Sequence, residues 1–331
     1  MTIRTTAPSL IAALLLLAQA PAPAAAAPAA NDPDEDEPQE QSDARWAASL
    51  ATEVDQASTR GFAGGLHYRV TPTTDVHFAA ESTSYTQTIN NGFTSQGVEL
   101  GAGHEFKWFG LDAAVAHWQA LDILAANELG IGAEARLGPW SIGPRLGYRR
   151  SSFNPFDVTV TDPTTGTTSS GAATCKLTND AYGLDGRFQG SVWGAHATFM
   201  DFRYSDASCA VNPGTGAPIV TVHQTQAQFA QLVGTIVQPM SVAATRYIGR
   251  DETLMDSDLD AGVSWKHNDL VVALGYARQK EYFTGDGSST YFATGTADLG
   301  NSTGIDCTIG LTRGAGVTEA AFVGFAVRAR F

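Results

Sequence analysis

The side chains most able to act on a solute are charged residues that recur at every second position of apolar segments. Near the end of the chain, Arg328 and Arg330 alternate with Val327 and Phe331. Side chains at i and i+2 of a β-strand point to the same face, so this spacing predicts a strand with one apolar and one charged face. The same alternation recurs at 97–107, 127–137 and 140–150.

We predict that these charged faces join into one surface that lines a pore. The candidate pore-lining residues are Arg69, Glu81, Glu105, Glu134, Arg136, Arg145, Arg149, Asp185, Arg187, Asp258, Asp260, Arg328 and Arg330. The same alternation places Asp201 and Arg203 on this face. The pairs Arg145/Arg149 and Arg328/Arg330 suit an anionic permeant, and Asp256, Asp258 and Asp260 suit a cationic one. Alternatively, facing acids and bases pair into salt bridges that nearly close the interior.

The first residues of the chain predict export. Arg4 precedes a short apolar run at 10–18, and Ala24 and Ala26 have the spacing of a cleavage site. We therefore predict a signal peptide at 1–26. Residues 27–43 contain an acidic, Pro-containing run with nothing to bury, so we expect a disordered periplasmic segment there.

Composition limits the remaining residues, 44–331, to a few classes of protein. The whole chain of 331 residues is 43% hydrophobic and 16% charged, with a formal net charge of −14. It is too apolar for a disordered chain, and its acidic balance argues against nucleic acid as a partner. A secreted globular protein and a transmembrane β-barrel remain.

Period-two alternation from residue 45 onward predicts an all-β chain of about twelve antiparallel strands in up-and-down order. The predicted strands are 45–55, 62–71, 75–86, 97–107, 110–120, 127–137, 140–150, 181–192, 195–205, 253–265, 269–284 and 317–331. A further hairpin near 288–297 and 302–312 would give fourteen, which parity also permits. Residues 223–250 could likewise contain a hairpin or a short helix.

The connections between these strands favour a barrel over a soluble sandwich. Short turns near 72–74, 108–110, 138–139, 193–194 and 266–269 alternate with long loops near 86–96, 152–180, 206–252 and 285–315. Tryptophans gather at the short turns and tyrosines at the long-loop ends, as expected for two interfacial girdles. The alternation therefore predicts a transmembrane antiparallel β-barrel.

Cysteine spacing predicts one disulfide. Cys175 and Cys209 fall in the long loops after the seventh and ninth predicted strands, which are neighbours on the same side, and an exported protein meets oxidising conditions. We predict the pair Cys175–Cys209. A bond to Cys307, or three unpaired thiols, are the alternatives.

The signal peptide, the amphipathic strands and a last strand ending in Phe331 resemble Gram-negative outer-membrane β-barrel proteins of the porin-like kind. The resemblance implies location in the outer membrane and contact with its lipid and lipopolysaccharide. It also implies that the barrel-assembly machinery is a partner during biogenesis, with Phe331 as the assembly signal. A protein partner at the long loops is a further possibility.

The expected function is a channel for passive passage of small polar or charged solutes. A non-conducting barrel that anchors or binds a partner through its long loops is the alternative. An outer-membrane lipid hydrolase or protease is less favoured, because it needs a histidine beside a serine or an aspartate at the outer rim. His117 and His223 fall nearest that rim, and neither lies in a His-x-Ser motif. We expect no catalytic residues, no metal and no cofactor.

Overall fold

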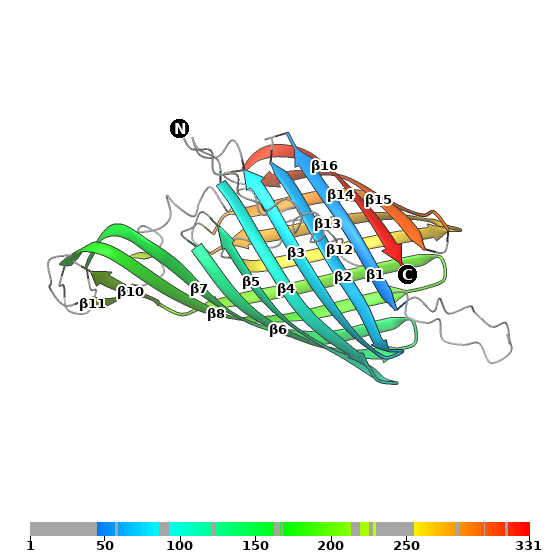
Figure 1. The fold of residues 1–331 in the computed structure, drawn as a ribbon, viewed down its shortest axis with the longest axis horizontal. Coiled ribbons are helices and arrows are strands. Elements are labelled where there is room, and N and C mark those ends of the chain that lie inside the picture. The colour runs from blue at the N-terminus through cyan, green and yellow to red at the C-terminus, as the bar shows by residue number, and fades with distance from the viewer. Residues whose placement is uncertain are drawn as a thin grey trace, which may run out of the picture.

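Alternating apolar and polar residues form sixteen strands in the described part of the computed structural model (Figure 1). The structure describes residues 45–56, 59–85, 93–120, 124–161, 166, 168–212, 219–224, 228–229, 255–282, 285–300, 302–314 and 317–331. The predicted signal peptide and acidic segment lie outside these residues. The strands are β1 (Trp46–Asp55), β2 (Arg60–Thr71), β3 (Thr74–Tyr85), β4 (Phe93–Glu105), β5 (Phe109–Ala120), β6 (Leu124–Leu137), β7 (Trp140–Thr161), β8 (Thr168–Gln189), β9 (Trp193–Tyr204), β10 (Ala207–Asn212), β11 (Val220–Gln224), β12 (Met255–His267), β13 (Leu270–Glu281), β14 (Gly287–Asp298), β15 (Thr303–Gly314) and β16 (Val317–Arg330).

Fourteen of these strands close into an antiparallel barrel, which leaves β10 and β11 outside it. Each barrel strand pairs with its sequence neighbour, and β9 pairs with both β8 and β12. The first and last strands close the ring, in a register that runs from Ala47 opposite Arg330 to Asp55 opposite Phe322. The predicted all-β, up-and-down barrel is therefore confirmed, with the alternative count of fourteen.

The prediction of twelve strands was wrong because 285–315 contains the hairpin β14–β15 rather than a loop. Its two strands pair from Ser288 opposite Gly314 to Asp298 opposite Gly304. Threonine, glycine and alanine occupy many positions on both faces of this hairpin, so its hydropathy alternates weakly along the sequence. Pairing across the two strands supplies the backbone hydrogen bonds that hydropathy did not signal.

Large apolar side chains cover the outside of the barrel. Leu100, Leu146, Leu184 and Ile309 are each more than half exposed to the surroundings. Short turns join β2–β3, β4–β5, β6–β7, β8–β9, β12–β13 and β14–β15 at one end of the barrel, which is called here the turn end. Trp108, Trp140, Trp193 and Trp265 lie at this end. The opposite end is called the loop end. Among the described residues, no helix is long and apolar enough to cross a membrane.

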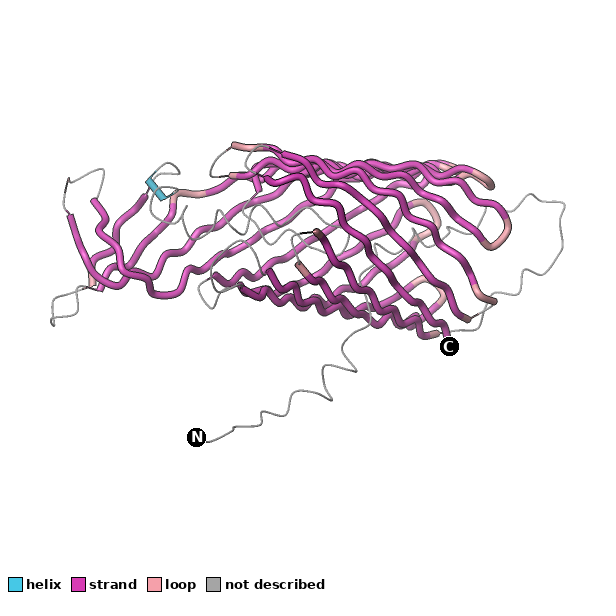
Figure 2. The backbone as a smooth tube through the Cα atoms, turned by 90° about the horizontal axis from the view of Figure 1, so that it is seen from above, coloured by secondary structure: helices cyan, strands magenta, loops and turns pink. Residues whose placement is uncertain are grey.

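Two strands continue far past the barrel at the loop end (Figure 2). β7 and β8 each contain 22 residues, and β10 and β11 add to the edge of β8 there. Thr159 and Ser170 hydrogen-bond across this hairpin at 2.8 Å. The prediction of a loop over most of 152–180 was therefore wrong. Its Ser-, Thr- and Gly-rich composition is typical of a loop, and cross-strand pairing overrides that tendency.

This extension has an apolar core of its own, built where β8 and β10 meet. Phe153, Leu177 and Val211 are fully buried in it, together with the disulfide between Cys175 and Cys209, which are register partners. Tyr282 packs against Tyr204 at the edge, with ring centroids 3.9 Å apart. Burial, and then the charges of Asp206 and Asp256, raise the pKa of Tyr282 to about 12, so its phenol stays neutral in this core.

Cys307 takes no part in this core. It lies on β15 as an exposed free thiol opposite Phe325, on the apolar outer surface of the barrel. A hairpin or a short helix was expected in 223–250. The structure describes only the end of β11 and residues 228–229 of this segment, and the rest lies outside the described residues.

Deletion of Phe331 is expected to lower the amount of barrel in the outer membrane more than it weakens the barrels that form. Phe331 is 66% exposed, so few packing contacts are lost with it. Its backbone exchanges two hydrogen bonds with Trp46, each 3.0 Å long, at the seam between β1 and β16. Quantifying membrane-inserted protein against total protein measures assembly, and the unfolding midpoint of the purified barrel measures stability. Equal assembly of both forms would contradict the prediction.

Candidate pore wall

The inner surface of the barrel carries the charged face that the sequence predicts. Side chains alternate across each strand, so the positions between the exposed apolar residues point inward. All thirteen candidate pore-lining residues occupy such inward positions in the paired register. Asp201 and Arg203 do not, because both pair on the face of Tyr182, which points outward.

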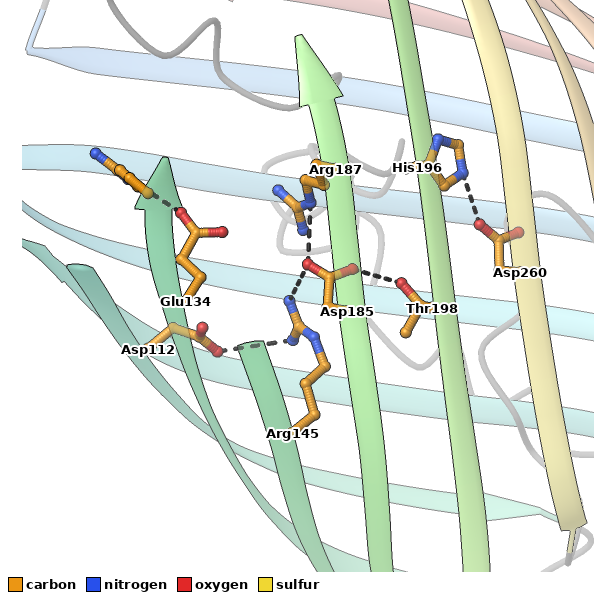
Figure 3. Close-up of polar contacts among 9 residues, drawn as sticks. Asp112, Glu134, Arg145, Asp185, Arg187, His196, Thr198 and Asp260 are labelled. Carbon is orange, nitrogen blue, oxygen red and sulfur yellow. Dashed lines mark hydrogen bonds and ion pairs between the residues drawn. The ribbon is translucent and has the colours of Figure 1, made fainter. Parts of the chain in front are cut away.

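Five inward residues on β5, β7, β8 and β9 form a connected group, called here the central cluster (Figure 3). They are Asp112, Arg145, Asp185, Arg187 and Thr198. Arg145 lies between two carboxylates, 3.8 Å from Asp112 and 3.8 Å from Asp185. Arg187 Nε lies 3.1 Å from the same Asp185 carboxylate, and Thr198 Oγ1 donates a 2.6 Å hydrogen bond to it.

Exposure divides the central cluster into a fixed and an accessible part. The Asp185 side chain is 6% exposed, whereas Arg145 and Asp112 are 34% and 48% exposed. A buried carboxylate with three partners positions the groups around it, because burial strengthens each of these interactions. The accessible guanidiniums and the Asp112 carboxylate therefore face the lumen as a preorganised polar surface.

A further pair and a group of three continue this surface along the wall. His196 Nε2 lies 2.8 Å from Asp260 Oδ1 across β9 and β12, beside the central cluster in Figure 3. Toward the turn end, Arg136 bridges Glu105 at 2.9 Å and Glu134 at 3.1 Å. Four of these five side chains come from the predicted set, and His196 adds a group that is part of no recognisable motif.

Glycines on neighbouring strands let these side chains lie along the wall instead of across the lumen. A Cβ at Gly262 would stand 2.6 Å from the His196 ring, and one at Gly132 would overlap the carboxylate of Asp112. Side chains that lie over a glycine need less room in the interior.

Arg149 belongs to a different and closed site. Its guanidinium lies 2.7 Å from Glu128 and is 8% exposed, and it also covers the Trp118 ring, which donates a 2.8 Å hydrogen bond to Glu128. Arg145 and Arg149 therefore do not form one anion site, although their spacing suggested a pair. Arg149 cross-links β5, β6 and β7 beneath the apolar core of the extension.

A second closed site joins the last strands of the barrel. Asp306 is 3% exposed and receives a 2.6 Å hydrogen bond from Thr296, and Arg328 Nε lies 3.1 Å from its second oxygen. Thr294 and Thr308 share a buried hydroxyl pair at 2.9 Å next to it. Arg328, a predicted pore residue, therefore acts mainly within the wall.

Carboxylates outnumber guanidiniums on the inward strand positions. There are fifteen carboxylates and seven arginines among the described residues, and three histidines besides. The carboxylates are Glu53, Asp55, Asp75, Glu81, Glu99, Glu105, Asp112, Glu128, Glu134, Asp185, Asp258, Asp260, Glu281, Asp298 and Asp306. The arginines are Arg69, Arg136, Arg145, Arg149, Arg187, Arg328 and Arg330. At neutral histidine, the carboxylates and arginines give the wall a net charge of about −8.

Sequence reasoning missed Asp112 and Asp306 as wall residues. Each is flanked by apolar or small neighbours, in LDAAV and GIDCTIG. The available signal was their even-numbered position in a strand whose odd-numbered neighbours are apolar. Recognising it for Asp306 required knowing that β15 exists.

The barrel is closed and antiparallel, with an apolar exterior and a charged interior, and its first strand begins and its last strand ends at the turn end. This is the architecture of outer-membrane β-barrel proteins. Closure satisfies the backbone of every strand without water, which permits the structure to span a lipid bilayer. The turn end is then periplasmic and the loop end extracellular.

Comparisons with known proteins give distant similarities. No family model matches the chain, and no curated protein matches its sequence. The chain is similar to the CymD monoaromatic hydrocarbon channel, with 8% identity, a TM-score of 0.47 and coverage of 87% of this chain and 89% of that one. It is also similar to OpdK of Pseudomonas aeruginosa with vanillate, with 8% identity, a TM-score of 0.38 and coverage of 86% of this chain and 97% of that one. A third similar structure is OmpT, an outer membrane protein of Vibrio cholerae, with 11% identity, a TM-score of 0.37 and coverage of 86% and 96%. The assignment to the class rests on the barrel itself.

Proposed function

We propose that the protein is a porin-like outer-membrane channel for passive passage of small polar or charged solutes. The observation that carries this proposal is the accessible part of the central cluster, where Arg145, Arg187 and Asp112 face the lumen from three strands. Polar groups fixed in a pore wall replace part of the hydration of a passing solute. The cluster lies in the half of the barrel nearer the turn end, since Asp112 is the fourth residue of β5 and Arg145 the sixth of β7.

We further propose that the channel prefers cations. Each of Arg136, Arg145, Arg149, Arg187 and Arg328 lies within 4 Å of at least one carboxylate, so their charge is largely balanced locally. The remaining excess of acidic groups lowers the energy of a cation in a narrow passage more than that of an anion.

Conductance of the purified barrel in planar bilayers tests this function. Under a salt gradient we expect ohmic conductance and a reversal potential of the sign set by cation flow. Absence of conductance from barrels that show the heat-shifted gel migration of a folded protein would overturn the channel. Conductance with an anion-selective reversal potential would overturn only the preference.

Neutralising single wall charges should move this preference in opposite directions. Arg145→Gln is expected to raise the cation-to-anion permeability ratio by roughly twofold to fivefold, and Asp112→Asn to lower it by a similar factor. The reason is that one wall charge changes the energy of a passing ion by about 1 kcal/mol. Arg313→Gln, an exposed charge at the loop end, is the control and should leave the ratio unchanged. Equal ratios for all four proteins would show that the cluster does not line the conducting path.

The extension at the loop end favours a second candidate function, partner binding. A disulfide-linked sheet with its own buried core presents a more defined surface than isolated loops. A non-conducting barrel that binds a partner through β7, β8, β10 and β11 would give a folded protein without conductance. Neither candidate includes a catalytic step: His117 lies on the outward face and shares a 3.0 Å hydrogen bond with Asn127, and His223 is exposed on β11.

A further inference from the structure

Lysines and arginines sort into three places on this barrel. Of the seventeen among the described residues, seven point inward, and Arg45, Lys107 and Lys266 lie at the periplasmic end. The other seven point outward near the extracellular end. This outer basic belt consists of Arg60, Arg150, Lys176, Arg203, Arg278, Lys280 and Arg313.

Strand geometry places the outer basic belt at the outer edge of the apolar band. Arg150 follows Trp140 by ten residues on β7, and Arg203 follows Trp193 by ten on β9. Ten strand residues span about 33 Å, which at a tilt of about 40° rises about 25 Å, the height of the apolar band of an outer-membrane barrel. The tryptophans then mark the periplasmic edge, and the basic residues the extracellular edge.

The belt is densest on β7, β8 and β9. Arg150 is the register partner of Thr178, Lys176 lies two residues from Thr178 on the same strand, and Arg203 is the partner of Asp180. These three cations therefore lie within three adjacent strands, about 10 Å across. Arg203 is 76% exposed and covers the Tyr182 ring of the outer aromatic girdle, 5.5 Å from its centroid.

Several of these cations lack a counter-charge among the residues that the structure describes. Arg203, Lys280 and Arg313 lie beside Asp201, Asp256 and Glu319. Within the described part of the chain, no carboxylate lies in ion-pair contact with the exposed Arg150, Lys176 or Arg278. Unpaired guanidinium and ammonium groups at the border of an apolar surface are suited to phosphate, which accepts charge-assisted hydrogen bonds from both.

We propose that the outer basic belt binds the phosphates of the phosphorylated glycolipid of the outer leaflet. The asymmetry between seven outward bases at this end and three at the periplasmic end places most of the outward positive charge at the extracellular leaflet, where the phosphates of lipopolysaccharide would lie. The aromatic girdle below the belt would hold the acyl chains, and the belt would hold the headgroup. This proposal is independent of conduction.

The test measures binding of bisphosphorylated lipid A to the whole protein in detergent, by native mass spectrometry. The variant Arg150→Gln/Lys176→Gln/Arg278→Gln should bind about a hundredfold more weakly, because each charge near a lipid surface contributes roughly a factor of five. The matched control Arg45→Gln/Lys107→Gln/Lys266→Gln removes the same charge at the periplasmic end and should bind as the natural protein does. Arg150→Gln alone, expected to bind about fivefold more weakly, serves if the triple variant does not fold.

Two other lipids test whether the phosphates of lipid A are the groups that the belt binds. Lipid A stripped of both phosphates should bind no better to the natural protein than to the triple variant, and phosphatidylglycerol should bind more weakly than lipid A. The proposal is overturned if the natural protein does not bind lipid A, or if both triple variants lose the same affinity. It is also overturned if removal of the phosphates makes no difference, or if phosphatidylglycerol binds equally well.

Discussion

Gly143→Val is expected to reduce the yield of folded barrel by about tenfold or more, because β7 approaches β6 too closely for any side chain there. A Cβ at Gly143 would overlap the backbone carbonyl of Ala133 and stand 2.6 Å from the Cα of Glu134. Both are backbone atoms of a paired strand, so relief requires moving β6 itself. Pro144, which follows, restricts the backbone further.

Heat-shifted gel migration after refolding into detergent measures the folded fraction. The control is Gly130→Ala on β6, an inward glycine of the same sheet whose added Cβ would meet nothing within 4 Å. This variant should fold with the yield of the natural protein. If Gly143→Val folded as well as Gly130→Ala, the close approach of β6 and β7 would be refuted.

Asp306→Ala is expected to lower the free energy of unfolding by about 3–5 kcal/mol, because it leaves a buried guanidinium without its carboxylate. Arg328 is 16% exposed, and Asp306 provides its nearest acidic oxygens, with Thr296 donating to the same carboxylate. Removal of a carboxylate from a pair this buried costs more than the pair contributes in the intact protein.

Denaturant titration of the barrel in lipid vesicles, followed by tryptophan fluorescence, measures this loss. Asp298→Ala is the matched control, since Asp298 is 49% exposed and 3.9 Å from the same arginine, and it should change the free energy by less than about 1 kcal/mol. The double variant Asp306→Leu/Arg328→Met should recover most of the stability that Asp306→Ala loses. Equal losses for Asp306→Ala and Asp298→Ala would exclude a special role for the buried pair.

The candidate site was predictable where it depends on one strand alone. Alternation by itself identified Arg145, Asp185, Arg187 and Asp260 as inward residues. Their grouping was not predictable, because Arg145 meets Asp112 and Asp185 through register with strands on both sides. The same alternation misplaced Asp201 and Arg203, because their apolar neighbours Met200, Phe202 and Tyr204 point inward at this end of β9, where Tyr204 packs against the core of the extension.

The sequence alone determined the transmembrane barrel, the inward and outward faces of most strands and the tryptophan girdle at the short turns. These features repeat every second residue or mark a turn, so they depend on neighbours in the chain. Tertiary structure decided the count of fourteen strands, the extension of β7 and β8, and the division between accessible Arg145 and enclosed Arg149. Each of these depends on backbone pairing between segments whose own side chains are small or polar. Such segments gain their stability from the partner strand, and the partner is specified by register rather than by local composition.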